Sequence, residues 1–228
     1  MKLVIFDVDG TLVDSQAYII MSMSAAFAEA GRPAPDRGEI LSIVGLSLPL
    51  AMRELAPDVD DETLGRMVEA YKSAFQKHRL AQGAAASPLY PGAEEMVRRL
   101  AGRGDLYLAI ATGKSRRGLN ALLDGWDFAD VFVSTQSADE HPSKPHPSMV
   151  ETCLMECGLE ASDAVVIGDT TYDMEMAKAA RCHAIGVNWG YHGPDALLTA
   201  GAVEVLSDFS ALETALTRLW PELSKKDD

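Results

Sequence analysis

Four short apolar runs rich in valine, isoleucine and leucine recur along the chain, and helical patterns separate them. Such runs are typical of strands in a parallel sheet that is covered by helices on both faces. Weaker strand patterns lie at residues 130–134 and 203–206. The sequence therefore predicts an α/β fold with a doubly wound parallel sheet. The four strong runs are LVIF at 3–6, LYLAIA at 106–111, AVVI at 164–167 and HAIGV at 183–187.

Apolar spacing predicts helices between these strands at residues 92–103, 116–123, 147–157, 172–180 and 210–220. The segment from Ser15 to about Arg79 interrupts the alternation, because it has helical stripes and no strand pattern. A plain crossover needs about a dozen residues. We therefore expect a helical unit at residues 15–88, inserted into an α/β core formed by residues 1–14 and 89–228. Residues 82–92 are the expected return linker.

The chain of 228 residues carries a net charge of −14 and has a pI near 4.7. Nucleic acids and anionic membrane surfaces would repel such a protein, so neither is an expected partner. No segment has the length of a signal-peptide core or a membrane span. The three cysteines form no C-x-x-C pair, which favours reduced thiols and a cytoplasmic protein. Monomer and homodimer both stay open.

Polar side chains follow each strong strand, where ligands bind in open parallel sheets. DVDGT begins at Asp7, TGK begins at Thr112 and GDTTYD begins at Gly168, while SKPHP precedes the helix at 147–157. Clustered carboxylates repel one another and are costly to bury unless a cation offsets them. Their oxygen ligands suit Mg²⁺. We therefore expect a magnesium site formed by Asp7, Asp9, Asp169 and Asp173. A calcium-binding EF-hand loop is disfavoured, because its glycine would come later and no strand would precede it.

The same loops contain groups that can hold a phosphate. Thr112 and Gly113 are expected at a helix start, where a hydroxyl and backbone N–H groups bind anions. Lys144 offers a mobile point charge between two prolines. An aspartate can attack phosphorus, and a second acid two residues away can protonate the leaving alcohol. The sequence thus predicts phosphoryl transfer from a small phosphorylated molecule.

The segments FDVDGTLVDS, ATGK, SKPHP and GDTTYD, in this order, resemble the four motifs of the haloacid dehalogenase superfamily. The resemblance spans residues 2–193. It implies that Asp7 is the nucleophile, that Asp9 is the general acid–base and that Thr112 and Lys144 hold the phosphate. It also implies that Asp7, the Asp9 carbonyl and Asp169 bind Mg²⁺, with Asp173 in or beside the metal shell. The helical insert resembles the cap domain of that superfamily.

An acid at position 9 favours the phosphatase branch of the superfamily, and VNWGYHGP at 187–194 resembles a segment of phosphoglycolate phosphatases. The resemblance implies Mg²⁺-dependent hydrolysis of a small phosphomonoester through an aspartyl-phosphate, with phosphoglycolate as the leading substrate. Two alternatives stay open: a phosphohexomutase similar to β-phosphoglucomutase, and a non-enzymatic protein that binds a phosphorylated ligand. A sugar phosphate, a nucleotide or pyrophosphate stays open as substrate.

Within the insert, Gly45 interrupts a helical pattern in the stretch from Ser42 to Leu50, which is expected to overhang the site. Gly45, Ser47 and Arg53 are the expected substrate contacts there. No role is assigned to His141 or His146, which flank the lysine of SKPHP.

Overall fold

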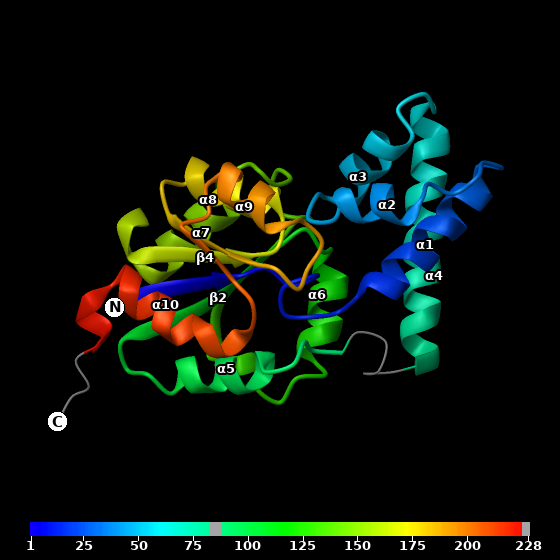
Figure 1. The fold of residues 1–228 in the computed structure, drawn as a ribbon. Helices are drawn as coiled ribbons and strands as arrows, with labels where there is room; N and C mark the ends of the chain where they lie inside the picture. Colours follow the sequence, from blue (N-terminus) through cyan, green and yellow to red (C-terminus); the bar gives the residue numbers. More distant parts are fainter. Residues whose placement is uncertain (83–87, 225–228) are drawn as a thin grey trace.

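The computed structural model describes residues 1–82 and 88–224 and contains a single sheet of six parallel strands among them (Figure 1). The strand order is β3-β2-β1-β4-β5-β6. All six predicted strands are present, and β3 begins two residues later than the pattern indicated. Their bounds are Lys2–Phe6 (β1), Leu106–Thr112 (β2), Phe132–Ser137 (β3), Ala164–Gly168 (β4), His183–Val187 (β5) and Glu204–Leu206 (β6).

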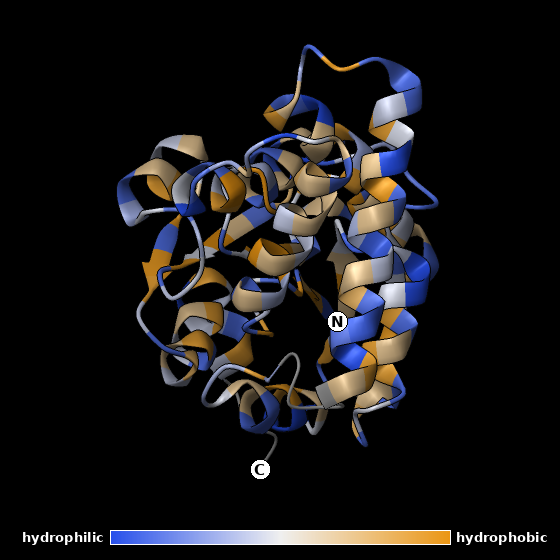
Figure 2. Cartoon of the chain, turned by 90° about the vertical axis from the view of Figure 1, so that its right-hand side faces the viewer, coloured by the Kyte–Doolittle hydropathy of each residue, from blue (hydrophilic) through white to orange (hydrophobic). Residues whose placement is uncertain are grey.

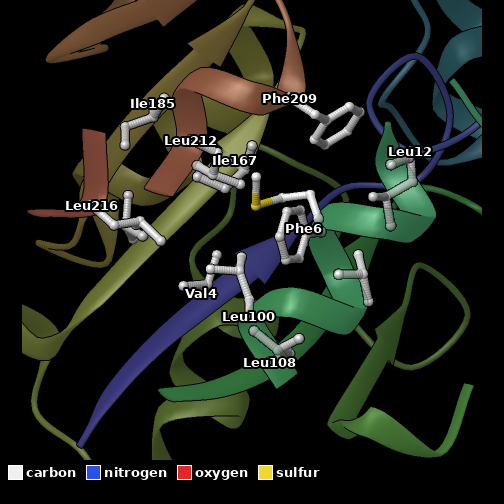
Figure 3. Packing of buried hydrophobic residues seen from close by; sticks show 14 of the residues in the cluster. Val4, Phe6, Leu12, Leu100, Leu108, Ile167, Ile185, Phe209, Leu212 and Leu216 are labelled. Atoms are coloured by element: carbon white, nitrogen blue, oxygen red, sulfur yellow. The ribbon is translucent and has the colours of Figure 1, made fainter. Parts of the chain in front are cut away.

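Helices cover both faces of this sheet, as the apolar runs predicted. Side chains alternate along β1, so that Val4 and Phe6 join one apolar cluster, which Figure 3 shows, whereas Leu3 and Ile5 join the cluster on the other face. The first cluster includes residues of α5 (Ala93–Ala101), α6 (Arg116–Leu123) and α10 (Leu212–Leu219). The second includes residues of α7 (Ser148–Cys157), α8 (Thr171–Ala179) and α9 (Pro194–Ala200). Helix α9 was not predicted. Short 3₁₀ turns lie at Ala129–Val131, Ala161–Asp163, Phe209–Ala211 and Pro221–Ser224.

Four further helices lie to one side of the sheet in Figure 1 and pack on one another. They are α1 (Gln16–Glu29), α2 (Arg37–Ser42), α3 (Leu48–Leu55) and α4 (Asp61–Gln82). A third apolar cluster joins them, with Met23, Phe27, Met52 and Met67 almost fully buried. Apolar and polar bands alternate along α4 in Figure 2, as expected for a helix that buries one side.

The loop between α2 and α3 lies against the core. The hydroxyl of Tyr172 donates to the carbonyl oxygen of Ser42 at 3.2 Å, and His192 Nε2 lies 3.2 Å from the same oxygen. The backbone N–H of Ser47 donates to Ser143 Oγ at 2.8 Å. These contacts join residues 96 to 150 positions apart and hold the helical unit over the edge of the sheet.

Three remaining expectations concern the chain as a whole. Residues 83–87 of the predicted return linker and residues 225–228 lie outside the described part of the chain. All three cysteines are free thiols, as expected; Cys153 is buried, and Cys157 and Cys182 are half-buried. Among the described residues, no helix combines the length and the apolar character that a membrane crossing requires.

Candidate active site

Three buried carboxylates meet at the carboxyl edge of the sheet. Asp7 directly follows β1, and its backbone N–H donates to the carbonyl of Ile167 in β4 at 3.0 Å. Asp169 directly follows β4, and Asp173 lies in the first turn of α8. One carboxylate oxygen from each of these three aspartates lies within 4.8 Å of the others. The parallel register of β1 and β4 therefore places acids more than 160 positions apart in one cluster.

Asp169 is held by two hydrogen bonds and by two glycines. Thr11 Oγ1 donates to Oδ1 and the backbone N–H of Tyr191 donates to Oδ2, both at 2.9 Å. A Cβ atom on either Gly10 or Gly190 would lie 2.2 Å from the Asp169 side chain, a distance that real contacts do not reach. Gly10 also has φ +85°, which favours glycine. Only glycine fits at both positions.

Asp173 is fixed by the N-terminus of α8. Its Oδ2 accepts hydrogen bonds from the backbone N–H of Thr170 at 3.0 Å and from Thr170 Oγ1 at 2.6 Å. Thr170 and Asp173 form a capping box, which orients the carboxylate toward the cluster. Its other oxygen, Oδ1, accepts from Lys144 Nζ at 2.7 Å.

Lys144 is fully buried, which corrects the expectation of a mobile point charge. Its Nζ lies 3.0 Å from Asp7 Oδ2 and 2.7 Å from Asp173 Oδ1. Burial alone would lower the pKa of Lys144, but the attraction of Asp173 and Asp7 outweighs burial and raises this pKa. The side chain therefore stays cationic. The two carboxylates repay the cost of burying the ammonium group and fix its position.

Asp7 has unused binding capacity. Both of its carboxylate oxygens are buried, and apart from the ion pair between Oδ2 and Lys144 neither has a hydrogen-bond partner among the described residues. Burial raises the pKa of Asp7 to about 7; Lys144 opposes this rise and Asp173 adds to it. Burial, together with the charges of Asp173 and Asp7, also raises the pKa of Asp169. Lys144 alone thus does not balance the cluster. A buried acid whose Oδ1 has no partner among the described residues, beside two further carboxylates, fits a hard divalent cation such as Mg²⁺.

We expect this acid cluster to make Mg²⁺ stabilisation dependent on pH. In the metal-free protein, folded Asp7 keeps its proton up to about pH 7, whereas the unfolded chain releases it near the ordinary value of 3.8. Rising pH between these values therefore lowers the free energy of unfolding contributed by Asp7. Because Mg²⁺ binds the ionised form, it should raise Tm more at pH 8 than at pH 5.

Differential scanning fluorimetry with and without 5 mM Mg²⁺, on the wild type and on Asp7→Asn, would measure this effect. The difference between the two proteins isolates Asp7 from the other carboxylates. A Mg²⁺-induced rise in Tm that is equal at pH 5 and pH 8 would contradict the expectation.

Asp9 lies beside the carboxylate cluster and faces the same cavity as Asp7. Ser15 Oγ donates to Asp9 Oδ1 at 2.6 Å, and Lys114 Nζ lies 2.8 Å from Asp9 Oδ2. The carboxylate of Asp9 does not belong to the cluster of carboxylate oxygens that Asp7, Asp169 and Asp173 form. Lys114 was not selected from the sequence. Its position two residues after Thr112, at the end of a predicted strand, is the sequence signal that could have identified it.

A cavity of about 500 Å³ opens between the sheet edge and the helices α1–α4, and Asp7 and Asp9 line it. Thr112 and Gly113 also line it, although helix α6 begins only at Arg116, with Ser115 as its N-cap, rather than at Thr112. Gly45 and Ser47 line the opposite wall.

Arg53 does not line this cavity, so it is not brought to the place expected of a substrate contact. Its guanidinium donates instead to the carbonyl oxygen of Val59 and to the carboxylate of Asp61. The bend after α3 brings these two acceptors to the arginine. Arg53 therefore ties the end of α3 to the start of α4.

The two histidines without an assigned role lie outside the cavity lining. His141 bridges Ser148 Oγ at 2.8 Å and Gln136 Oε1 at 2.9 Å. His146 is exposed, and its Nδ1 accepts from the backbone N–H of Ser148 at 3.2 Å. These bonds brace the loop that carries Lys144 at the start of α7.

We expect Gly113→Ala to lower kcat/KM about 100-fold, because misplacement by about 1 Å can cost that much. A Cβ atom at Gly113 would lie 2.3 Å from the carbonyl oxygen of Gly45, and backbone cannot yield as a flexible side chain can. The loop carrying Gly45 and Ser47 would have to move off the site. Gly104→Ala is the matched control, because nothing lies within 4 Å of the added atom. Wild-type kcat/KM in Gly113→Ala would show that the close approach is not needed.

Comparison with known proteins gives consistent matches along most of the chain. A sequence model of the family described as "Haloacid dehalogenase-like hydrolase" matches residues 4–187. The "Probable phosphatase IndB" of Dickeya dadantii is 37% identical over 91% of this chain and 90% of its own length. A "Phosphoglycolate phosphatase" of Pseudomonas savastanoi pv. phaseolicola is 30% identical over 92% of this chain and 78% of its own length. The crystal structure of a predicted phosphatase from Clostridium acetobutylicum superposes with a TM-score of 0.83 at 25% identity, covering 95% of this chain and 98% of that one.

Proposed function

This chain belongs to the haloacid dehalogenase-like hydrolase family and is a phosphatase, and we propose that it hydrolyses a small phosphomonoester through an aspartyl-phosphate on Asp7. The observation that carries the proposal is the state of Asp7. Both carboxylate oxygens are buried, their one close cation among the described residues is Lys144 at Oδ2, and the side chain faces a cavity that Asp9 also lines.

In the first step, an Oδ atom of Asp7 forms a bond to phosphorus while the bond from phosphorus to the leaving oxygen breaks. Asp9 gives its proton to that oxygen, which departs as an alcohol. In the second step, Asp9 takes a proton from water, and the water oxygen attacks phosphorus and releases Asp7. Ser15 and Lys114 contact both oxygens of Asp9 and hold its carboxyl group in place beside the cavity.

The transferring phosphoryl group needs positive charge and donors around its oxygens. Lys144, the hydroxyl of Thr112 and the backbone N–H of Gly113 are the groups that we place there. Asp7, Asp169 and Asp173, with the Asp9 backbone carbonyl, are the residues that would hold Mg²⁺. When bound, the ion would neutralise charge on the phosphoryl oxygens.

We further propose that residues 15–88 act as a cap over a core of residues 1–14 and 89–228. The separate apolar cluster of α1–α4 and the loop from Ile43 to Ser47 over the cavity support this division. The names of several relatives make phosphoglycolate the reference substrate, while the relative with 37% identity is named only as a probable phosphatase.

Trapping the intermediate tests the proposal directly. Enzyme turning over p-nitrophenyl phosphate with Mg²⁺ is quenched with borohydride, which reduces an aspartyl-phosphate to homoserine. Peptide mass spectrometry should find homoserine at position 7, and EDTA should abolish both the trapped product and phosphate release. Turnover without a trapped residue, or with a trapped residue elsewhere, would remove Asp7 from its role. Net phosphate release also separates a hydrolase from a phosphohexomutase.

A further inference from the structure

The cavity over Asp7 and Asp9 is larger than a phosphoglycolate molecule needs. Its volume is about 500 Å³, which lies within the range of roughly 300–1,000 Å³ for pockets that bury drug-sized ligands. A phosphoryl group and a two-carbon glycolate would leave much of this space to solvent.

One wall of the cavity is apolar, whereas the basic residues Lys72, Arg79, Lys114 and Arg117 line other parts of it. Two of these cations are already paired with acids, Lys72 with Glu69 and Lys114 with Asp9. Ile19 and Met23 from α1, and Ile43, Leu46 and Leu48 from the loop before α3 and its first residue, all line the cavity. Placing a carboxylate such as that of glycolate against such a wall costs free energy unless a cation pairs with it. An uncharged apolar body would instead gain by losing contact with water.

Two aromatic rings of α4 stand beside the reacting end of the cavity. Lys114 Nζ lies 2.8 Å from the carboxylate of Asp9 and 4.9 Å from the centroid of the Phe75 ring, so this ring is close to the proposed proton donor. The ring of Tyr71 is stacked with that of Phe75 at a centroid distance of 6.1 Å and an interplanar angle of 19°. Both side chains line the cavity.

The hydroxyl of Tyr71 has no hydrogen-bond partner among the residues that the structure describes, and it is available to a ligand. Burial and the charge of Asp9 raise the pKa of Tyr71, so the hydroxyl keeps its proton and can donate. An apolar wall, a pair of rings and one convergent donor are the usual components of a site for a planar molecule.

We propose that the preferred substrate is a monophosphate ester whose leaving alcohol carries a flat ring, which packs on Phe75 and accepts a hydrogen bond from Tyr71. This inference rests on the proposed phosphatase chemistry at Asp7. It assigns the class of substrate: nucleoside monophosphates and ring-bearing alkyl phosphates, rather than phosphoglycolate.

Two matched substrate pairs test the inference. Uridine 5′-monophosphate and ribose 5-phosphate lose phosphate from the same primary oxygen and differ in the ring. The second pair, 2-phenylethyl phosphate and propyl phosphate, differs in a ring that has no acceptor atom for Tyr71, so it tests packing on Phe75 alone. We expect kcat/KM to be at least tenfold higher for the ring-bearing member of at least one pair, and higher than for phosphoglycolate.

Phe75→Leu should lower this preference about tenfold, mainly through a higher KM, because stacking on an aromatic side chain is worth about that much. Phe75→Tyr should keep the preference. Leu80→Ala, on an exposed residue of the same helix, is the control. No preference in either pair, or equal losses on both members in Phe75→Leu, would overturn the inference. Failure of p-nitrophenyl phosphate and every other ester to release phosphate would instead overturn the proposed function.

Discussion

Asp7→Asn should fold and yet lose at least about 10⁴-fold in phosphatase turnover, as expected when a covalent nucleophile is removed. An amide oxygen is a poor nucleophile, and its uncharged group is a weaker ligand for Mg²⁺. The same change should raise Tm at pH 8 without metal. At that pH the wild type holds an ionised carboxylate whose environment favours the neutral form, because burial raises the pKa of Asp7 to about 7.

Turnover of p-nitrophenyl phosphate and a thermal unfolding scan on the same preparation measure both effects. The opposite directions of the two changes exclude misfolding as the cause of lost activity. Asp130→Asn, at an exposed carboxylate outside the cavity lining, is the matched control and should change neither quantity. Turnover of Asp7→Asn within tenfold of the wild type would contradict the proposed mechanism.

Lys144→Met should abolish activity and lower the free energy of unfolding by about 3–5 kcal/mol at pH 8, the range found when one partner of a buried ion pair is removed. Methionine fills a similar volume but leaves Asp7 and Asp173 without their cation, which lies 3.0 and 2.7 Å away in the wild type. The loss should be smaller at pH 5, where the metal-free Asp7 is neutral. A purely steric effect would not depend on pH.

Urea unfolding at the two pH values in EDTA makes this comparison. Lys178→Met is the control, since it removes the same charge from an exposed position of α8. An equal loss at pH 5 and pH 8 would show that packing, rather than charge, explains the role of Lys144.

The fold was predictable from the sequence because local patterns determine it. Each strong apolar run became a strand, since β-branched residues between helical patterns fit only a sheet that is buried on both faces. Helix α9 was missed because its seven residues, Pro194–Ala200, are too short to show a helical period. The four helices of the insert were expected as a group, but their packing depends on contacts that no local pattern shows.

The site was predictable only in part for a related reason. The strand-end acids are visible as a spacing along the chain, and the parallel sheet brings them together. The burial of Lys144 is not visible, because its partners lie 137 positions before it and 29 positions after it. In the same way, Arg53 looked like a free cation for substrate until the fold placed Asp61 beside it. Whether a charged side chain binds substrate or stabilises the fold depends on partners that are distant in the sequence.

The glycines around the acids carry a consequence for tolerance to mutation. Gly10 and Gly190 lie against Asp169, Gly168 lies against Asp173, and Gly113 lies against the backbone of the opposite loop. In a deep mutational scan, these positions should be as intolerant as the acids, even to alanine. Strong selection would then act on residues that have no side chain, because the neighbouring carboxylates of Asp169 and Asp173 occupy the space that a Cβ atom would need.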